Sequence, residues 1–292
     1  ESFAPSGTIE SRVASEIGLP AGIPVSYRAG DQPNNAFSLR VLEPGELAAT
    51  AGTSGVVYGI VDKPVYEEKS RVNTFVHVNH RTGGGSDDRF GVLLNINGTG
   101  ILNKWTKQIA ADPVEGDPLD YGKVNEIASQ SPIGSKGLVF LPFGNGAERI
   151  LENSDVNASL HNLNFNIHER PELFRAAQEG IVFALNFGIE IMRDMGLSVQ
   201  TVRAGDANMF LSPIFREAFA TTTGAAVELS STDGSEGAAR GAGVGAAIYK
   251  NFDEAYRGLE LKEQIEPDQS KKDAYQEAYE RWETVLKERA LP

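Results

Sequence analysis

The hydrophobic positions of this chain change period along its length, which separates predicted strands from predicted helices. Short apolar runs bounded by glycine, proline or polar residues predict strands at 23–28, 47–51, 56–61, 73–78, 137–141, 198–203 and 226–229, with a glycine loop at 83–85. Apolar residues that repeat every three or four positions predict helices at 34–41, 97–111, 119–129, 171–195, 208–222 and 237–250. Because strands and helices follow one another along the chain, the pattern indicates an α/β fold.

Residues 251–292 combine many charges with an apolar stripe at helical spacing: Tyr275, Tyr279, Trp282, Val285 and Leu286. This pattern predicts an amphipathic terminal helix that docks on the rest of the chain by its aromatic stripe. The same stripe is also a candidate contact in a homodimer. Packing on the chain's own core is the more frequent use of such a stripe.

The composition excludes several classes of protein. The 292 residues carry a formal net charge of −13 and contain no cysteine. A disulfide scaffold, a cysteine-ligated metal and a thiol nucleophile are therefore excluded. The acidic balance argues against a nucleic-acid partner, which needs a basic footprint, and the apolar runs are too short to span a membrane. We expect a cytoplasmic protein, because nothing resembles a signal peptide.

Several possible ligand motifs fail on spacing. Gly122-Lys123 resembles the end of a P-loop, but Val124 stands where that motif requires serine or threonine. His77 and His80 are three residues apart, which on a strand places them on opposite faces. We therefore predict no metal site built from residues of this chain.

Two segments carry possible chemistry. Asp31 and Gln32 follow the predicted strand at 23–28 directly, where an aspartate acts either as a general base or as the cap of the next helix. Gly52-Thr53-Ser54-Gly55 joins two apolar strands, and its glycines leave backbone N–H groups free to face an anion. An ordinary hairpin turn is the alternative for the second segment.

In their order, these and four further segments resemble the FGGY family of carbohydrate kinases. The segments read GLPAGIPVSYRAGDQPNNAF, GTSGVV, LVFLPFGNGAERI, HERPELFRAAQEGIVFAL, TVRAGDANMFLSPIFREAFA and EGAARGAGVGAA, and they span roughly residues 18–250. The resemblance implies an actin-like ATPase fold with a ribonuclease-H-like lobe, in which a mixed sheet has helices on both faces. It implies that residues 1–42 end an N-terminal, sugar-binding lobe and that 43–292 form the C-terminal, nucleotide-binding lobe.

The resemblance also assigns roles to matching positions. Asp31 is implied as the base that takes the proton from the attacking sugar hydroxyl, and Gln32 as a sugar contact. Thr53, with Gly52 and Gly55, is implied to hold the transferring phosphoryl group.

Three further positions are implied to contact ATP. Gly100 begins the helix that lies against the nucleotide phosphates, where a helix start favours anions. Gly205 lets the backbone pass beneath the adenosine, and Asn208 falls on the adenine side. The family usually has Gly-Gly where this chain has Ala204-Gly205. We therefore expect the methyl group of Ala204 to crowd the nucleotide.

The expected reaction is transfer of the γ-phosphoryl of ATP to a sugar hydroxyl, with Mg²⁺ as cofactor. GTSGVV and the acidic tail are most similar to the xylulose-specific members, so D-xylulose is the expected substrate. The alternatives are another FGGY kinase, acting on ribulose, gluconate or a polyol, and a non-catalytic sugar- or nucleotide-binding module. Asp31 comes early and the chain begins at Glu1 rather than Met. We therefore expect a fragment that is inactive alone, with its magnesium ligand in the missing first lobe.

Overall fold

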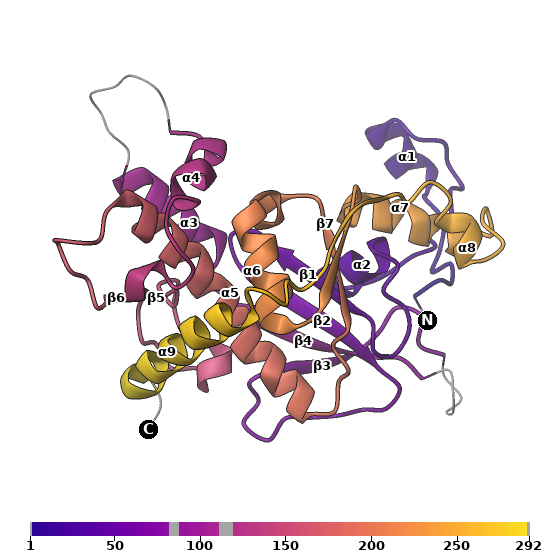
Figure 1. Cartoon of the computed structure of the whole chain (residues 1–292). Helices are drawn as coiled ribbons and strands as arrows, with labels where there is room; N and C mark the ends of the chain where they lie inside the picture. The colour runs from indigo at the N-terminus through magenta and orange to yellow at the C-terminus, as the bar shows by residue number, and fades with distance from the viewer. Residues whose placement is uncertain (1, 82–87, 111–118, 291–292) are drawn as a thin grey trace.

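A computed structural model describes residues 2–81, 88–110 and 119–290, so that Glu1 and the loop predicted at 83–85 lie outside the described residues. Its strands are β1 (Leu47–Ala51), β2 (Gly55–Val61), β3 (Asn73–Val76), β4 (Phe90–Ile96), β5 (Val139–Leu141), β6 (Ser159–His161), β7 (Thr201–Gly205), β8 (Ala226–Ser230) and β9 (Leu261–Ile265). Seven of them form one sheet in the order β3-β4-β2-β1-β7-β8-β9, and β5 and β6 form a separate hairpin (Figure 1).

The sheet is mixed, and its parallel part lies in the middle. β1 pairs with β7 and β7 with β8 in parallel, whereas the other neighbours pair antiparallel. The carboxyl ends of β1, β7 and β8 therefore meet at one edge of the sheet. In α/β sheets this edge is where ligands bind.

Nine α-helices and three 3₁₀ turns surround the strands in the described part of the chain. They are α1 (Ser11–Ile17), α2 (Asp31–Ser38), α3 (Gly100–Ile109), α4 (Tyr121–Ala128), η1 (Ser135–Gly137), η2 (Arg149–Leu151), α5 (Arg170–Asp194), η3 (Asn208–Leu211), α6 (Pro213–Thr223), α7 (Gly234–Gly245), α8 (Phe252–Ala255) and α9 (Lys272–Ala290). None of these helices is both long and apolar enough to cross a membrane.

Helices cover both faces of the sheet because successive residues of its strands point to opposite sides. Leu47 and Ala49 of β1 belong to the larger core, which includes residues of α5, α6 and α9. Ala48, between them, packs in a second core with Ala36 and Leu39 from α2 and its end. The prediction of a mixed sheet with helices on both faces is confirmed.

Helix α5 follows the prediction closely because its sequence marks both ends. Glu169 and Glu172 form a capping box, in which the backbone N–H of Glu169 donates to Oε2 of Glu172 at 3.0 Å. Pro171 occupies the first turn, where its missing N–H has no helical partner to lose. Gly196 ends the segment with a φ of 92°, a backbone conformation that favours glycine.

The tail docks on the chain's own core, as the aromatic stripe predicts. Tyr275, Trp282 and Leu286 of α9 are fully buried, and Trp282 Nε1–H donates to the carbonyl oxygen of Phe140 at 3.0 Å. The stripe is thus covered within one chain. The tail also contains β9, which pairs with β8 and was not predicted.

The strand predicted at 23–28 is wrong. The segment joins neither sheet: its backbone bonds to residues 2–9 around an isolated bridge between Thr8 and Pro24, and Tyr27 stacks on Phe3. Strand β4 was missed because Leu93 follows Val92 and precedes Leu94, so the sequence shows no clear apolar–polar alternation there although burial alternates from Val92 to Ile96. The helix predicted at 208–222 is divided into η3 and α6 at Ser212, whose side chain caps α6.

Candidate functional site

The turn Gly52-Thr53-Ser54-Gly55 joins β1 to β2 at the ligand-binding edge of the sheet. Its carbonyl groups are fixed by the start of α3. The N–H of Gly100 donates to the carbonyl oxygen of Gly52 at 2.8 Å, and the N–H of Ile101 donates to that of Thr53 at 3.2 Å. The hydroxyl of Thr99 donates to the same two oxygens at 3.2 and 3.1 Å.

The N–H side of this turn is open. Among the described residues, no hydrogen bond uses the backbone N–H of Gly52, Thr53 or Ser54, and the side chain of Thr53 is exposed. Consecutive free N–H groups beside a hydroxyl form a concave donor surface that suits an anion. A phosphate-binding turn requires such free donors, and the phosphate-binding role itself stays a prediction.

Close approach explains two of the predicted glycines. A Cβ on Gly100 would lie 2.3 Å from the carbonyl oxygen of Gly52, and a Cβ on Gly55 would lie 2.6 Å from Cγ2 of Thr99. The helix can therefore meet the turn only because both positions lack a side chain. The backbone N–H of Gly100 is used by the turn itself, so its contact with a phosphate stays a prediction.

Residues of the segment LVFLPFGNGAERI contact the residues that lead into α3. A Cβ on Gly98 would lie 1.6 Å from the carbonyl oxygen of Pro142. Glu148 is fully buried, and both of its carboxylate oxygens lie 3.0 Å from the backbone nitrogen of Asn97, which donates to them. Burial raises the pKa of Glu148 to about 7. The sequence indicated this segment only through the family resemblance, without a role for Glu148.

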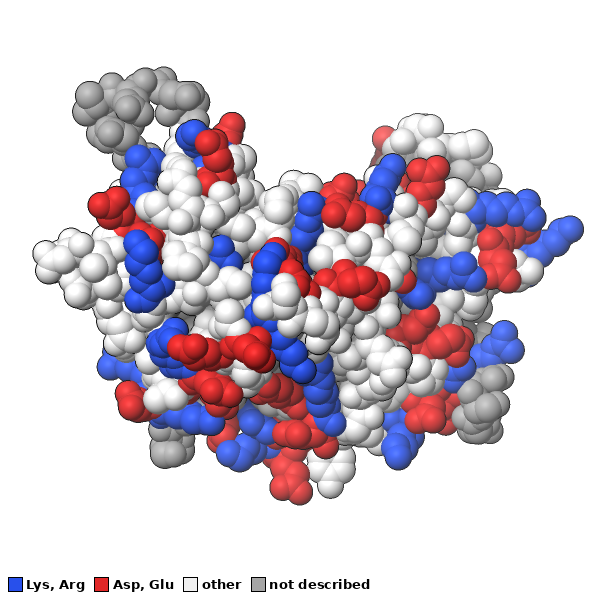
Figure 2. Space-filling model, in the orientation of Figure 1, with Lys and Arg blue, Asp and Glu red and all other residues white. Residues whose placement is uncertain are grey.

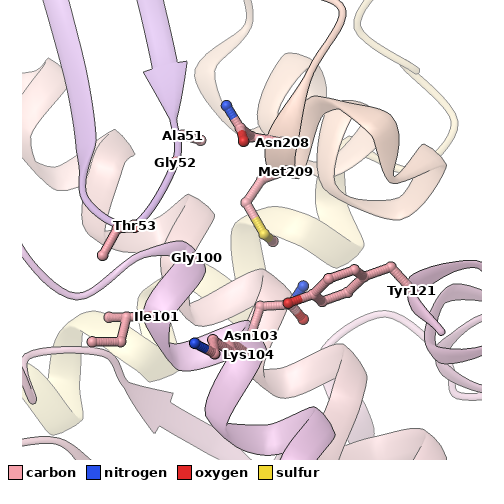
Figure 3. Close-up of a pocket in the computed structure, with 10 residues that line it drawn as sticks. All are labelled: Ala51, Gly52, Thr53, Gly100, Ile101, Asn103, Lys104, Tyr121, Asn208 and Met209. Carbon is pink, nitrogen blue, oxygen red and sulfur yellow. The ribbon is translucent and has the colours of Figure 1, made fainter. Parts of the chain in front are cut away.

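A cavity of about 290 Å³ opens on one side of the turn (Figure 3). It is lined by Ala51, Gly52, Thr53, Gly100, Ile101, Asn103, Lys104, Tyr121, Asn208 and Met209. Figure 3 shows Thr53 at one side of this space and Tyr121 at the other. Asn103, Lys104, Tyr121 and Met209 were missed from sequence. Lys104 lies four residues after Gly100, and this helical spacing is the signal that could have found it.

A second cavity, of about 330 Å³, opens on the other side of the turn. Its lining includes Gln32, Asn35, Thr50, Ser54, Gly205 and Asp233, which come from α2, β1, the turn, the end of β7 and the loop after β8. Four residues line both cavities: Ala51, Gly52, Thr53 and Asn208. The turn therefore stands between two adjoining spaces.

Asp31 and Gln32 lie at the start of α2 beside the second cavity. Gly30 is the N-cap residue and has no side chain, so the capping role considered for Asp31 does not apply. The exposed carboxylate of Asp31 accepts the backbone N–H of Gln32 at 2.9 Å and the side-chain amide of Gln32 at 3.2 Å. Gln32 lines the second cavity, whereas Asp31 lines neither cavity and is joined to the cavity wall by the side-chain amide of Gln32.

The loop after β7 corrects one expectation. The side chain of Ala204 is fully buried in the larger core and lines neither cavity, so its methyl group does not crowd this space. Adjacent strand residues point to opposite faces, which is why Gly205 lines the second cavity instead. Asn208 has a φ of 55° and lies close to Gly52.

The charges around the site are few. Among the described lining residues, Lys104 is the only basic one and Asp233 the only acidic one. Hydrogen bonds from Ser235 and Glu236 to its carboxylate hold the pKa of Asp233 below its usual value.

No group of three His, Asp or Glu side chains in the described residues could hold a metal ion. Basic and acidic residues are mixed over the face shown in Figure 2, without a large patch of one sign.

Comparison with known proteins assigns this architecture. Residues 47–249 match the C-terminal domain of the FGGY family of carbohydrate kinases. The chain belongs to this family. The members are phosphotransferases that act on sugar hydroxyl groups. The match covers six of the seven strands of the sheet, the turn and the first cavity, whereas β9 and the residues of α2 that line the second cavity lie outside it.

The similar proteins differ in the sugar they are named for. Over 289 residues the chain is 26% identical to the xylulose kinase of Haemophilus influenzae, covering 96% of the chain and 54% of that protein. It is 30% identical over 181 residues to the gluconokinase of Bacillus subtilis, covering 59% of the chain and 33% of that protein. The solved xylulose kinase of Rhodospirillum rubrum aligns with 98% of the chain and 55% of that structure, with a TM-score of 0.81 and 21% identity. The chain thus spans about half the length of the xylulose kinases it matches.

Proposed function

We propose that this chain is the nucleotide-binding lobe of an ATP-dependent sugar kinase that phosphorylates D-xylulose at O5. The observation that carries the proposal is the turn at Gly52 and Thr53, which forms the shared wall of two cavities. Phosphoryl transfer needs two substrates that meet at one anion-binding point. The xylulose kinase relative, which aligns with nearly the whole chain, supports the choice of sugar.

In this proposal each cavity holds one substrate. ATP occupies the cavity lined by Lys104 and Tyr121, with its phosphates on the free N–H groups of the turn and on the hydroxyl of Thr53. The ammonium group of Lys104 balances part of the phosphate charge. The sugar lies on the side of Gln32, where its attacking oxygen faces the γ-phosphoryl group across the turn.

Asp31 acts as the general base. As the sugar oxygen attacks phosphorus and the bond from phosphorus to the ADP oxygen breaks, the hydroxyl proton passes to the carboxylate of Asp31. The sugar hydroxyl becomes acidic late in the reaction, as its oxygen bonds to phosphorus, and the carboxylate accepts its proton at that stage. The side-chain amide of Gln32, which donates to Asp31 at 3.2 Å, orients that carboxylate before the sugar binds.

Magnesium, the usual partner of ATP, neutralises phosphate charge when it is bound. The described residues do not provide a carboxylate cluster for it. We therefore place its protein ligands in the part of the enzyme beyond this chain, and the steps above do not depend on them.

A second candidate is a gluconate kinase with the same mechanism, because the Bacillus gluconokinase reaches 30% identity over its matched segment. A non-catalytic module is the weaker alternative. Such a module does not need a carboxylate that is bound to a residue lining the proposed sugar cavity.

The test is Asp31→Asn in a longer protein that contains this chain, assayed with xylulose, ribulose, gluconate and glycerol. We expect xylulose to give the highest kcat/KM, and the variant to lose about 10²–10⁴-fold in kcat while it still binds ATP. Asp62→Asn is the control, because Asp62 is exposed beyond the far end of β2. Near-normal turnover by Asp31→Asn would remove the base assignment, and preference for gluconate would favour the second candidate.

A further inference from the structure

One polar side chain in the first cavity has no role in the steps described above. Asn103 lies on α3, is 5% exposed and lines this cavity. Its Oδ1 atom is buried, and no hydrogen bond to it is formed by any residue of the described chain. A buried acceptor without a donor is unfavourable because it has lost its hydrogen bonds to water. A ligand that supplies the donor would recover this cost.

The surroundings of Asn103 suit a flat aromatic ring. The ring of Tyr121 and the side chain of Met209 form apolar walls of the same cavity. Lys107 holds the Tyr121 ring by placing its ammonium nitrogen 4.4 Å from the ring centre. Figure 3 shows Tyr121 on the opposite side of the cavity from Thr53, with Met209 between them, so one extended nucleotide could place its phosphates at the turn and its ring beside Tyr121.

We propose that the side-chain amide of Asn103 selects the base of the nucleotide, favouring adenine over purines with an oxygen at position 6. This inference rests on the proposed nucleotide site. An asparagine amide carries an acceptor and a donor side by side, which match the N6 amino group and N7 of adenine. Rotation of the amide about χ2 presents Oδ1 to the cavity without moving the backbone.

A 6-oxo purine pairs badly with the same amide. Hypoxanthine and guanine carry an acceptor oxygen where adenine has its amino group, so Oδ1 of Asn103 stays without a donor. Asn208 does not supply this selection, because it is exposed and lies beside Gly52 at the turn. Asn103 is thus a specificity residue for the base, distinct from the groups that hold phosphate.

Binding of ATP and of inosine triphosphate (ITP) to the purified 292-residue chain tests the inference, because these nucleotides share ribose and phosphates. We expect ATP to bind roughly 5- to 150-fold more tightly, as a good two-bond contact to a base gives. N6,N6-dimethyl-ATP, which lacks the donor, should bind as weakly as ITP. In Asn103→Leu the two affinities should become equal within about twofold, with that for ITP unchanged.

Gln108→Leu is the matched control, because Gln108 is exposed on the same helix and should keep the wild-type ratio. Equal binding of ATP and ITP by the wild-type chain overturns the inference, as does an unchanged ratio in a folded Asn103→Leu. The dimethyl nucleotide tests the same contact without any substitution if that variant does not fold. Absence of binding by every nucleotide overturns the proposed ATP site as well, whereas tight binding without selection overturns only the role of Asn103.

Discussion

The backbone N–H of Gly100 donates to the carbonyl oxygen of Gly52 at 2.8 Å, which joins the start of α3 to the turn between β1 and β2. The bond occupies the carbonyl side of the turn and leaves its N–H groups free. Two segments that are 48 positions apart in sequence thereby form the surface that we propose binds the phosphates of ATP. The geometry of the turn consequently depends on a helix that begins well beyond it.

Gly100→Ala tests this dependence. A Cβ at this position would lie 2.3 Å from a backbone oxygen, so the helix or the turn must shift. We expect the free energy of unfolding to fall by about 1–3 kcal/mol and nucleotide affinity to fall with it. Urea unfolding and a nucleotide titration measure the two effects.

Gly52→Ala is the matched control on the same turn, because the nearest atom to its Cβ would be 3.8 Å away. This variant should keep the wild-type unfolding free energy. Equal destabilisation by the two substitutions would show that contact with α3 does not determine the conformation of the turn.

Glu148→Gln tests the buried carboxyl behind α3. Burial raises its pKa in the folded chain to about 7, above the ordinary value of 4.5. Between these two values the unfolded chain releases a proton that the folded chain keeps, so the free energy of unfolding falls as pH rises. The contribution of Glu148 to the free energy of unfolding, roughly 3 kcal/mol, is fully present below about pH 4.5 and is lost as the pH rises through 7.

Glutamine cannot titrate, so Glu148→Gln should lose this slope whatever its stability at a single pH. Thermal unfolding from pH 4.5 to 8 measures the slope in both proteins. Glu68→Gln is the control, because Glu68 is exposed and should leave the profile of the parent chain unchanged. The same slope in Glu148→Gln and in the parent would refute the raised pKa.

Glu179→Gln tests the buried ion pair that links α5 to its neighbours. Arg175 Nε lies 2.7 Å from Glu179 Oε1, and Glu179 also accepts the N–H of Gly134 and the hydroxyl of Ser135. The variant leaves a buried guanidinium without its carboxylate, so we expect a loss of about 3–5 kcal/mol in the free energy of unfolding. Chemical denaturation measures it.

A surface pair provides the comparison. Lys287 and Glu283 lie 2.7 Å apart on α9, with over half of the lysine side chain exposed. Lys287→Met should change the free energy of unfolding by less than about 1 kcal/mol. A similarly small effect of Glu179→Gln would mean that the buried pair is solvated in solution.

Sequence patterns predicted those elements whose ends are marked by residues within or next to the element. Helix α5 has a capping box, a proline in its first turn and a glycine after its end, and its predicted bounds are confirmed to within one residue. Strand β4 has none of these signals, and Leu93 on its less buried face interrupts the apolar–polar alternation. The segment 23–28 does alternate, but no neighbouring strand pairs with it beyond one bridge.

The sequence by itself determined the family, the position of the Gly52–Gly55 turn and the aromatic stripe that docks α9, because these depend on residues close together in the chain. Only the tertiary structure decided what surrounds the turn. Asn103, Lys104 and Tyr121 reach the first cavity because α3 and α4 pack there, and Ala204 faces the core because of the pairing of β7. Such contacts join residues that are distant in sequence, so they cannot be predicted from local periodicity.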